Sequence, residues 1–226
     1  MKVKTYIAVS LTLLFHLCGF IGIAFSSYKN WFIQLTPLNL CLVFVLLLIN
    51  QQKINFSFIF FLIIAFATGM VTEIIGVHTH YLFGNYNYGN VLGIKLAQVP
   101  LLIGVNWFII IYCNCVAMNM LYVWMAKKLS QKDVAVPAKT KRLYFVIDVA
   151  LLATVFDFII EPVAVKLGFW YWHEHKIPLY NYASWFLISA LLAYVFKRFN
   201  TIARNYFAIH LLIIQLLFFL ALRIYL

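Results

Sequence analysis

Long apolar segments follow one another along almost the whole chain, separated by short polar stretches. A run of roughly 18–20 apolar residues can cross a hydrocarbon layer of about 30 Å as a helix. Because backbone groups in lipid must satisfy their hydrogen bonds internally, such runs fold as helices. We therefore expect an all-α fold: a polytopic membrane helical bundle of about seven transmembrane helices, forming a single integral membrane domain over residues 1–226.

The expected spans end where basic or polar residues interrupt the apolar runs. The first run is longer than the apolar core of a secretory signal peptide, so we expect it to remain as a span. The second run is short for a crossing. The expected spans are Thr5–Phe25, Thr36–Asn50, Phe56–Val77, Gln98–Ala126, Leu143–Val165, Tyr180–Phe196 and Asn205–Ile224.

The net charge of +11 is distributed as in a membrane protein. Hydrophobic residues make up 65% of the chain and charged residues only 10%, too few to cover a soluble domain. With the N-terminus inside, the basic residues facing the cytoplasm are Lys2, Lys4, Lys53, Lys127, Lys128, Lys132, Lys139, Lys141, Arg142, Lys197, Arg198 and Arg204. Those facing outward are Lys29, Lys95, Lys166, Lys176 and Arg223. This positive-inside bias predicts an N-in, C-out orientation and gives no reason to expect a nucleic-acid partner.

Three carboxyl groups inside the expected spans are the candidate catalytic residues. Ionisable side chains at membrane depth are costly, so each marks a candidate functional position. Glu73 falls near the outer end of the third span. Asp157 and Glu161 fall in the outer half of the fifth span, on one helix face because they are four residues apart. Asp148 is out of phase with them and nearer the inner side, where we expect a structural role.

Polar and aromatic side chains of other segments are expected on the same outer side. Asn106 lies in the outer half of the fourth span, and Asn181 and Ser184 lie at the start of the sixth. The aromatic-rich loops HTHYLFGNYNYG and FWYWHEHKIPLYNYASW also face outward. The sequence therefore predicts one outward-facing pocket built from several helices. Tyr and Trp also gather at membrane interfaces without any catalytic role, so the aromatic residues alone do not establish a site.

Several carboxyl groups in an apolar pocket suit acid chemistry on an apolar substrate. A carboxyl group buried without a cationic partner keeps its proton near neutral pH, and neighbouring acids push one another into an acid form and a base form. Protonation of a trisubstituted alkene gives a tertiary carbocation, which aromatic faces and a neighbouring carboxylate stabilise. A second carboxylate can then orient water for attack or remove a proton.

Five motifs follow one another in order between Thr72 and Phe186. They are E-x-x-G, F-G-x-Y-x-Y-G, L-G-x-K-L-x-x-V-P-L-x-I-G-x-N-W, D-x-x-x-E-P-V-A and I-P-x-x-N-x-x-x-W-F. Together they resemble the signature regions of the carotenoid biosynthesis membrane protein family. That family includes CruF-type carotenoid hydratases, which act on monocyclic carotene or on bisanhydrobacterioruberin. The matching positions are Glu73, Gly84, Tyr86, Tyr88, Gly89, Lys95, Pro100, Asn106, Trp107, Asp157, Glu161, Pro162, Trp170, Pro178, Asn181 and Trp185.

The resemblance implies a hydratase of the bacterial cytoplasmic membrane that needs no cofactor and no metal. It would add water to the terminal double bond of an acyclic end group in a carotenoid of the lycopene or monocyclic carotene type. Its other partners would be membrane lipids and further enzymes of the carotenoid pathway. Asp157 or Glu73 would donate the proton, and Glu161 would orient the water. Substrate- or water-binding residues would be Asn106, Asn181, Tyr86, Tyr88, Trp107, Trp170 and Trp185.

Two other enzyme classes remain open. A membrane lycopene cyclase would protonate the same end group and let an internal double bond attack in place of water, although an Asn-rich lining favours bound water. A metal enzyme would use the outer-loop residues His78, His80, His173, Glu174 and His175, because imidazole suits zinc or iron. The longer histidine boxes of membrane di-iron oxygenases are absent from the sequence.

A carrier or proton-coupled transporter is the non-enzymatic alternative, since buried acids can relay protons. Inverted repeats and broken helices would favour it, but the sequence shows no internal repeat. Most buried polar residues fall on one side, which suits a one-sided pocket better than alternating access. His16 and Gln215 stand alone on apolar helices, and we interpret them as packing residues.

Overall fold

The computed structural model describes residues 3–129, 138–173, 176–199, 201 and 204–226. The helices of these ranges are α1 (Val3–Phe25), α2 (Lys29–Gln34), α3 (Thr36–Asn50), α4 (Phe56–Thr79), α5 (Leu101–Leu129), α6 (Ala138–Lys166), α7 (Leu179–Arg198) and α8 (Tyr206–Tyr225). Among residues named above, Lys2, Lys132, Glu174 and His175 lie outside the described ranges.

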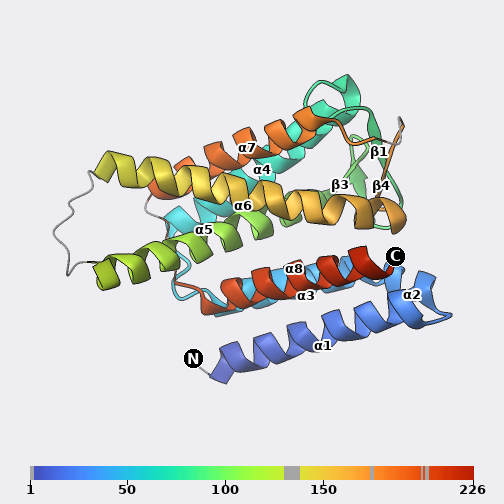
Figure 1. Ribbon diagram of the computed structural model, residues 1–226, viewed down its shortest axis with the longest axis horizontal. Coiled ribbons are helices and arrows are strands. Elements are labelled where there is room, and N and C mark those ends of the chain that lie inside the picture. Colours follow the sequence, from blue (N-terminus) through green and yellow to red (C-terminus); the bar gives the residue numbers. More distant parts are fainter. Residues whose placement is uncertain (1–2, 130–137, 174–175, 200, 202–203) are drawn as a thin grey trace.

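The expected all-α membrane bundle is confirmed. Six of the helices, α1 and α4 to α8, are long and apolar enough to cross a membrane, and α3 is a shorter apolar helix. The bounds of α3 agree with the expected second span. Figure 1 shows the two ends of the chain at opposite ends of the bundle, as an odd number of passes requires. Which end faces the cytoplasm stays a prediction.

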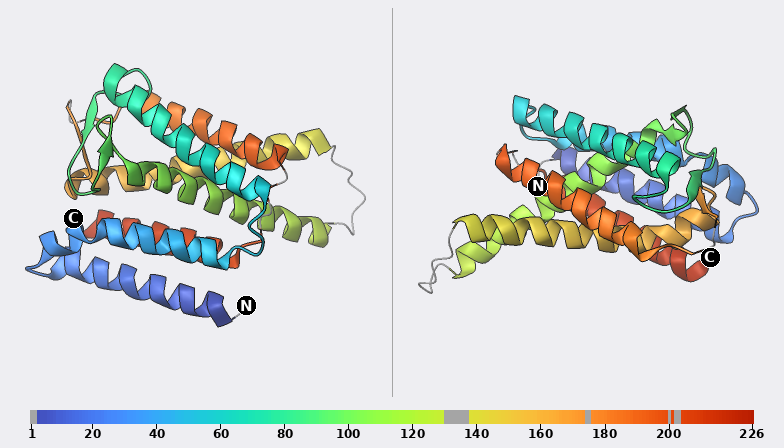
Figure 2. Two further views of the ribbon diagram at one scale, coloured as in Figure 1. Left: turned by 180° about the vertical axis from the view of Figure 1, so that it is seen from behind. Right: turned by 90° about the horizontal axis from the view of Figure 1, so that it is seen from above.

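Three pairs of helices make the most extensive contacts in the bundle. α6 packs against α7, α4 against α5, and α1 against α8. About two thirds (67%) of the apolar window of α5 is buried, against 28% for α1. Figures 1 and 2 show α1 at the periphery of the bundle, beside α8 and α3. The core therefore centres on α5, and α1 covers only one side.

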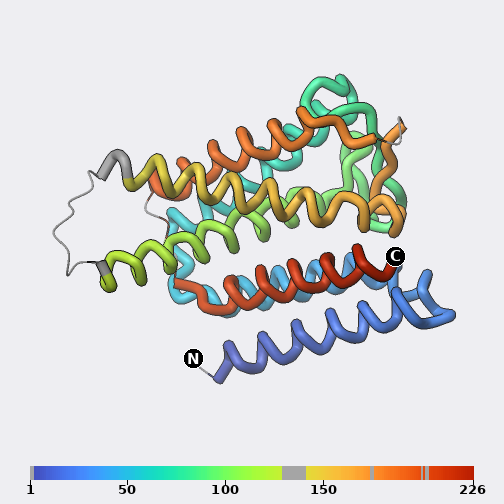
Figure 3. The backbone as a smooth tube through the Cα atoms, in the orientation of Figure 1, coloured from blue at the N-terminus to red at the C-terminus, as the bar shows by residue number. Residues whose placement is uncertain are grey.

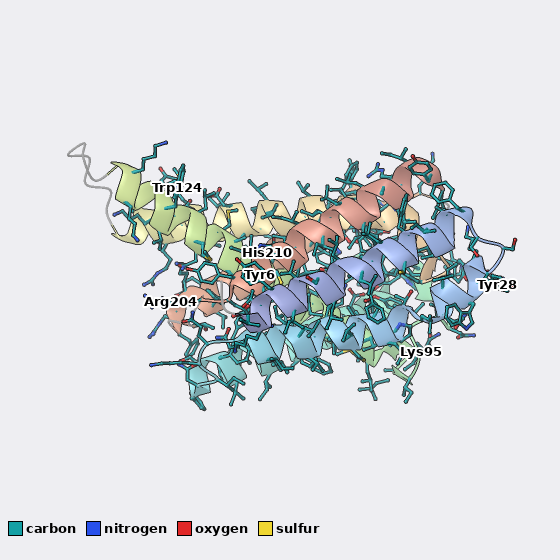
Figure 4. The ribbon with its side chains drawn as sticks, turned by 90° about the horizontal axis from the view of Figure 1, so that it is seen from below. Tyr6, Tyr28, Lys95, Trp124, Arg204 and His210 are labelled. Atoms are coloured by element: carbon teal, nitrogen blue, oxygen red, sulfur yellow. The ribbon has the colours of Figure 1, made fainter. Side chains whose placement is uncertain are left out.

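Lys95 and Arg204, one from each of the two expected sets of basic residues, lie at opposite ends of the bundle. In Figure 4, Lys95 lies at the same end as Tyr28, after the end of α1, whereas Arg204 lies at the other end, near Tyr6. This separation agrees with the expected division of the lysines and arginines into two sets.

The fourth span begins three residues later than expected. Ala97 and Gln98 have φ angles of 47° and 67°, in the left-handed region that a right-handed helix excludes. They form the turn between two short antiparallel strands, β2 (Lys95–Leu96) and β3 (Val99–Pro100). The helix α5 starts directly after this hairpin. The short helix α2 was likewise not expected from the sequence.

The two aromatic loops meet as a two-stranded ribbon. β1 (Tyr86–Tyr88) pairs antiparallel with β4 (Trp170–Trp172), so Tyr86 lies opposite Trp172 and Tyr88 opposite Trp170. A Cβ on Gly89 would lie 2.1 Å from the carbonyl oxygen of Gly168, so only glycine permits this approach of the two segments. Figure 3 shows the connections that form the ribbon gathered at one end of the bundle.

Candidate functional site

A cavity beneath the ribbon brings the predicted carboxyl groups together. Residues of α4 to α7 and of both ribbon strands line it. They are Glu73, Phe83, Tyr86, Tyr88, Ile103, Asn106, Trp107, Asp157, Glu161, Trp170, Trp172, Asn181 and Trp185. Every residue predicted from the sequence to be catalytic or to bind substrate or water is among them. We call this space the acid cavity. Its volume of about 30 Å³ has room for roughly two water molecules.

Glu73 accepts hydrogen bonds from three side chains. The hydroxyl groups of Tyr86 and Tyr88 donate to its Oε2 at 2.5 and 2.7 Å, and the Trp107 indole N–H donates to its Oε1 at 2.9 Å. Glu73 itself is 5% exposed. Its two oxygens are therefore both occupied by donors from the loop and from α5.

The tyrosines on the ribbon stay protonated and so remain donors. Burial raises the pKa of the Tyr86 and Tyr88 phenols well above their usual value, and the nearby Glu73 carboxylate raises it further. Their rings lie 5.6 Å apart, and that of Tyr86 lies 5.1 Å from that of Trp172. The ribbon thus supplies both hydrogen-bond donors and an aromatic cover.

Glu161 is held by the other ribbon strand. The indole N–H groups of Trp170 and Trp172 donate to its Oε2 at 2.9 and 3.0 Å. Alternate residues of a strand point to the same side, so both tryptophans face the cavity. Tyr171 between them is 53% exposed. The W-x-W spacing therefore directs two donors to one carboxyl oxygen.

Asp157 has fewer protein donors than either glutamate. The Asn181 amide N–H donates to its Oδ2 at 3.1 Å, and no other hydrogen bond joins its carboxyl group to the described residues. Asp157 and Glu161 lie on one face of α6, as their spacing predicts, and both are 3% exposed. Asp157 is therefore the carboxyl group of the cavity with the most acceptor capacity left for water or substrate.

Stacked tryptophans form one wall of the acid cavity. The rings of Trp107 and Trp185 lie 3.9 Å apart and nearly parallel, at 10°. A Cβ on Gly69 would lie 2.5 Å from Cγ of Trp107, so this glycine leaves space for the indole. Since the same indole donates to Glu73, packing between α4 and α5 determines where that hydrogen bond forms.

Pro162, next to Glu161, removes one backbone hydrogen bond from α6. Pro162 has no N–H, so the carbonyl of Phe158, four residues earlier, lacks its helical partner. Arg223 of α8 supplies it: its Nη1 donates to the Phe158 carbonyl oxygen at 3.0 Å. The guanidinium also lies 4.7 Å from the centre of the Phe158 ring. This contact supports the helix directly beneath Glu161.

Some features of the site were not expected from the sequence. Trp172 was missed as a site residue, although its alternation with Trp170 indicated it. Ser184, expected in the pocket, is not among the lining residues, and its hydroxyl donates to the carbonyl of Leu82. Asp148 lies apart, as expected, and accepts a hydrogen bond from Tyr122 at 2.5 Å.

The outer-loop histidines do not form a metal-binding group in the part of the chain that the structure describes. No cluster of three or more His, Cys, Asp or Glu side chains suited to a metal occurs there. Nδ1 of His78 is bonded to the backbone carbonyl of Ile74 at 2.9 Å, and His80 ends α4 in a left-handed conformation.

Comparison with known families identifies a family model that matches this chain. The family model described as carotenoid biosynthesis protein matches residues 33–226, most of the chain. The chain belongs to the carotenoid biosynthesis protein family. The matched region contains every residue of the acid cavity and begins after α1. No curated protein and no solved structure matches the chain significantly.

Proposed function

We propose that this member of the carotenoid biosynthesis family is a carotenoid hydratase of the bacterial cytoplasmic membrane that needs no cofactor. The observation that carries the proposal is the acid cavity, where three buried carboxyl groups surround a space of water-molecule size. Its described lining contains no Lys, Arg or His. An acid that is not neutralised by a cation, beside bound water, is what hydration of an unactivated double bond requires.

Asp157 is our choice of proton donor. The sequence left Asp157 and Glu73 as candidate proton donors, and their hydrogen bonds distinguish them. Both oxygens of Glu73 already accept hydrogen bonds from O–H and N–H donors, so neither is left to present a proton to the substrate. Asp157 accepts a single amide N–H and keeps an oxygen for a proton. Glu73 would then supply negative charge near the developing cation.

The reaction balances without a further reactant. The Asp157 carboxyl group gives its proton to the CH carbon of the terminal double bond, and the electron pair of that bond forms the new C–H bond. The tertiary carbon becomes a cation, which a water oxygen attacks. Glu161 takes the proton that this water loses, and a proton passed back to Asp157 through water restores the site. The product is a tertiary alcohol.

The aromatic lining would stabilise the cation and hold the water. The rings of Tyr86 and Trp172 line the cavity, tilted toward each other, and indole and phenol faces attract cations. The Asn106 amide lines the cavity and makes no hydrogen bond with another residue in the described ranges, so it remains available for water. Water held at this place would favour hydration over cyclisation.

Expression in bacteria that make lycopene, or a monocyclic carotene, tests the function. We expect the extracted pigment to gain one water per reacting end group, measured by chromatography and mass spectrometry. Asp157→Asn and Glu161→Gln should abolish the gain, because each removes a proton-transfer group. Glu73→Gln should reduce it less. Asp148→Asn, outside the cavity, is the matched control.

Other products would contradict the proposal in distinct ways. An isomer of unchanged mass with a new ring would identify a cyclase that shares the protonation step. Unchanged pigment in both hosts, with the protein present in the membrane, would leave the family membership but refute hydration of these substrates.

A further inference from the structure

A second cavity lies directly beside the acid cavity. The two share three lining residues, Ile103, Asn106 and Trp170. The second cavity has a volume of about 90 Å³ and lies among α1, α3, α5, α6 and α8. Its walls are mostly aliphatic and aromatic. The acid cavity therefore has a mostly apolar neighbour across Ile103, Asn106 and Trp170.

A groove at the bundle surface continues from the second cavity in turn. They share Ile23, Thr36, Asn39 and Phe218, and the groove has a volume of about 450 Å³. α1, α2, α3 and α8 form its walls. Leu38 on its rim is 67% exposed. These walls include the peripheral helix α1 and its neighbour α3, which lie side by side at the edge of the bundle (Figure 2).

We propose that this connected series, from the groove to the acid cavity, is a binding passage for the long apolar body of a carotenoid that enters sideways from the bilayer. The choice of reacting end group rests on the proposed function, but the passage can be tested without any turnover. Three observations identify the occupant: the family is that of carotenoid biosynthesis, the passage is apolar, and it ends at the acids.

The small size of the acid cavity is consistent with entry of the substrate from the side. About 30 Å³ accommodates water but not a branched hydrocarbon end group, and the ribbon covers it with the buried rings of Tyr86 and Trp172. An end group that arrives through the second cavity reaches the acids at the shared residues Ile103 and Asn106. The polyene would remain in the apolar part, and water would remain among the carboxyl groups.

Polar side chains interrupt the second cavity at its middle. His16 and Gln215, which we interpreted as packing residues, both line it. His16 does pack, with its ring edge-on to Phe218 at 5.2 Å and Nδ1 bonded to the Thr12 carbonyl. The buried amide oxygen of Asn39 has no hydrogen-bond partner in the described part of the chain. The passage therefore also accommodates a carotenoid that carries a hydroxyl donor there.

Two valines on α3 give a matched test. Val43 is fully buried and lines the second cavity, whereas Val45, two residues later, is 47% exposed and lines none of the three spaces. Protein purified from lycopene-producing bacteria should carry pigment, measured as absorbance per protein. Val43→Trp fills the cavity and should lower that ratio about tenfold, which corresponds to about 1.4 kcal/mol of binding. Val45→Trp should leave it unchanged.

A second pair covers the case in which Val43→Trp does not fold. Gly19 lines the groove, and a Cβ there would meet its nearest neighbour, Phe218, at 3.7 Å, so a larger side chain can be accommodated. Gly19→Trp should also reduce bound pigment, whereas Ile21→Trp, on the lipid-facing side of α1, should not. Size-exclusion chromatography shows which variants are folded.

The pigment measurement separates this inference from the hydratase proposal. Glu161→Gln should keep bound pigment even though it cannot hydrate. Pigment binding without any hydrated product would refute the proposed reaction and support the passage. Equal pigment in folded Val43→Trp, Gly19→Trp and wild-type protein would overturn the passage, as would wild-type protein without pigment.

Discussion

Replacement of Arg223 by alanine tests whether the site depends on the break in α6. Arg223→Ala removes the only described donor to the Phe158 carbonyl, because Pro162 cannot supply one. The part of α6 around Glu161 would then lose this hydrogen bond to α8. We expect lower stability and a smaller but measurable loss of hydration activity.

The magnitude follows from the two contacts that Arg223 makes. A hydrogen bond from a charged donor contributes about 1.5–3 kcal/mol, and a cation–π contact at an exposed site about 0.5–1 kcal/mol. Arg223 is exposed, so the lower end of each range applies. A loss of about 2 kcal/mol should lower the midpoint of thermal unfolding of detergent-solubilised protein by about 4–8 °C. Arg204→Ala, at the opposite end of the bundle, is the control.

A double-mutant cycle with Pro162→Ala gives the decisive result. An alanine at position 162 has an N–H that can bond to the Phe158 carbonyl, so Arg223→Ala should cost only about 0.5 kcal/mol in that background. The contrary result is that Arg223→Ala lowers the free energy of unfolding equally, within about 0.5 kcal/mol, whether position 162 is proline or alanine. That result would show that Arg223 does not stabilise the protein through the Phe158 carbonyl.

Two further changes separate positioning from bulk packing. Trp172→Phe keeps an aromatic ring but removes one of the two hydrogen-bond donors to Glu161. Hydration in the lycopene-producing host should therefore fall about tenfold or more, as the loss of a hydrogen bond to a charged group implies. Tyr171→Phe, on the other face of the strand, should have no effect, and an equal loss of activity in this control would refute the argument. Gly69→Ala would force the Trp107 ring to move, and we expect reduced product with normal protein levels, whereas wild-type turnover would show that the wall adapts.

The bundle and the members of the site could be predicted from sequence because both follow from the free-energy cost of placing polar groups in lipid, which each segment shows by itself. An apolar run must be a helix in lipid, and a carboxyl group in such a run is too costly to be incidental. The i, i+4 spacing of Asp157 and Glu161 was sufficient to place them on one face. Depth along each span then brought Asn106 and Asn181 to the same end.

What could not be predicted depends on contacts between distant segments. Neither Y-N-Y nor W-Y-W is long enough to identify a strand by itself, and each becomes one only by pairing with the other. The donor sets of Glu73 and Glu161 follow from that register, so the sequence did not separate Asp157 from Glu73 as proton donor. The link from Arg223 to Phe158 joins two helices that no spacing rule connects.

The ribbon also determines when a complete site can exist during synthesis. Its first strand, β1, leaves the ribosome several seconds before β4 at ordinary elongation rates. The helices α5 and α6 are synthesised between the two strands, and α7 and α8 follow β4. Until β4 arrives, Glu161 has no indole donors and the acid cavity has no cover. A chain truncated before β4 would insert but could not assemble the site, so reactive acids are enclosed only in a chain whose two halves have already met.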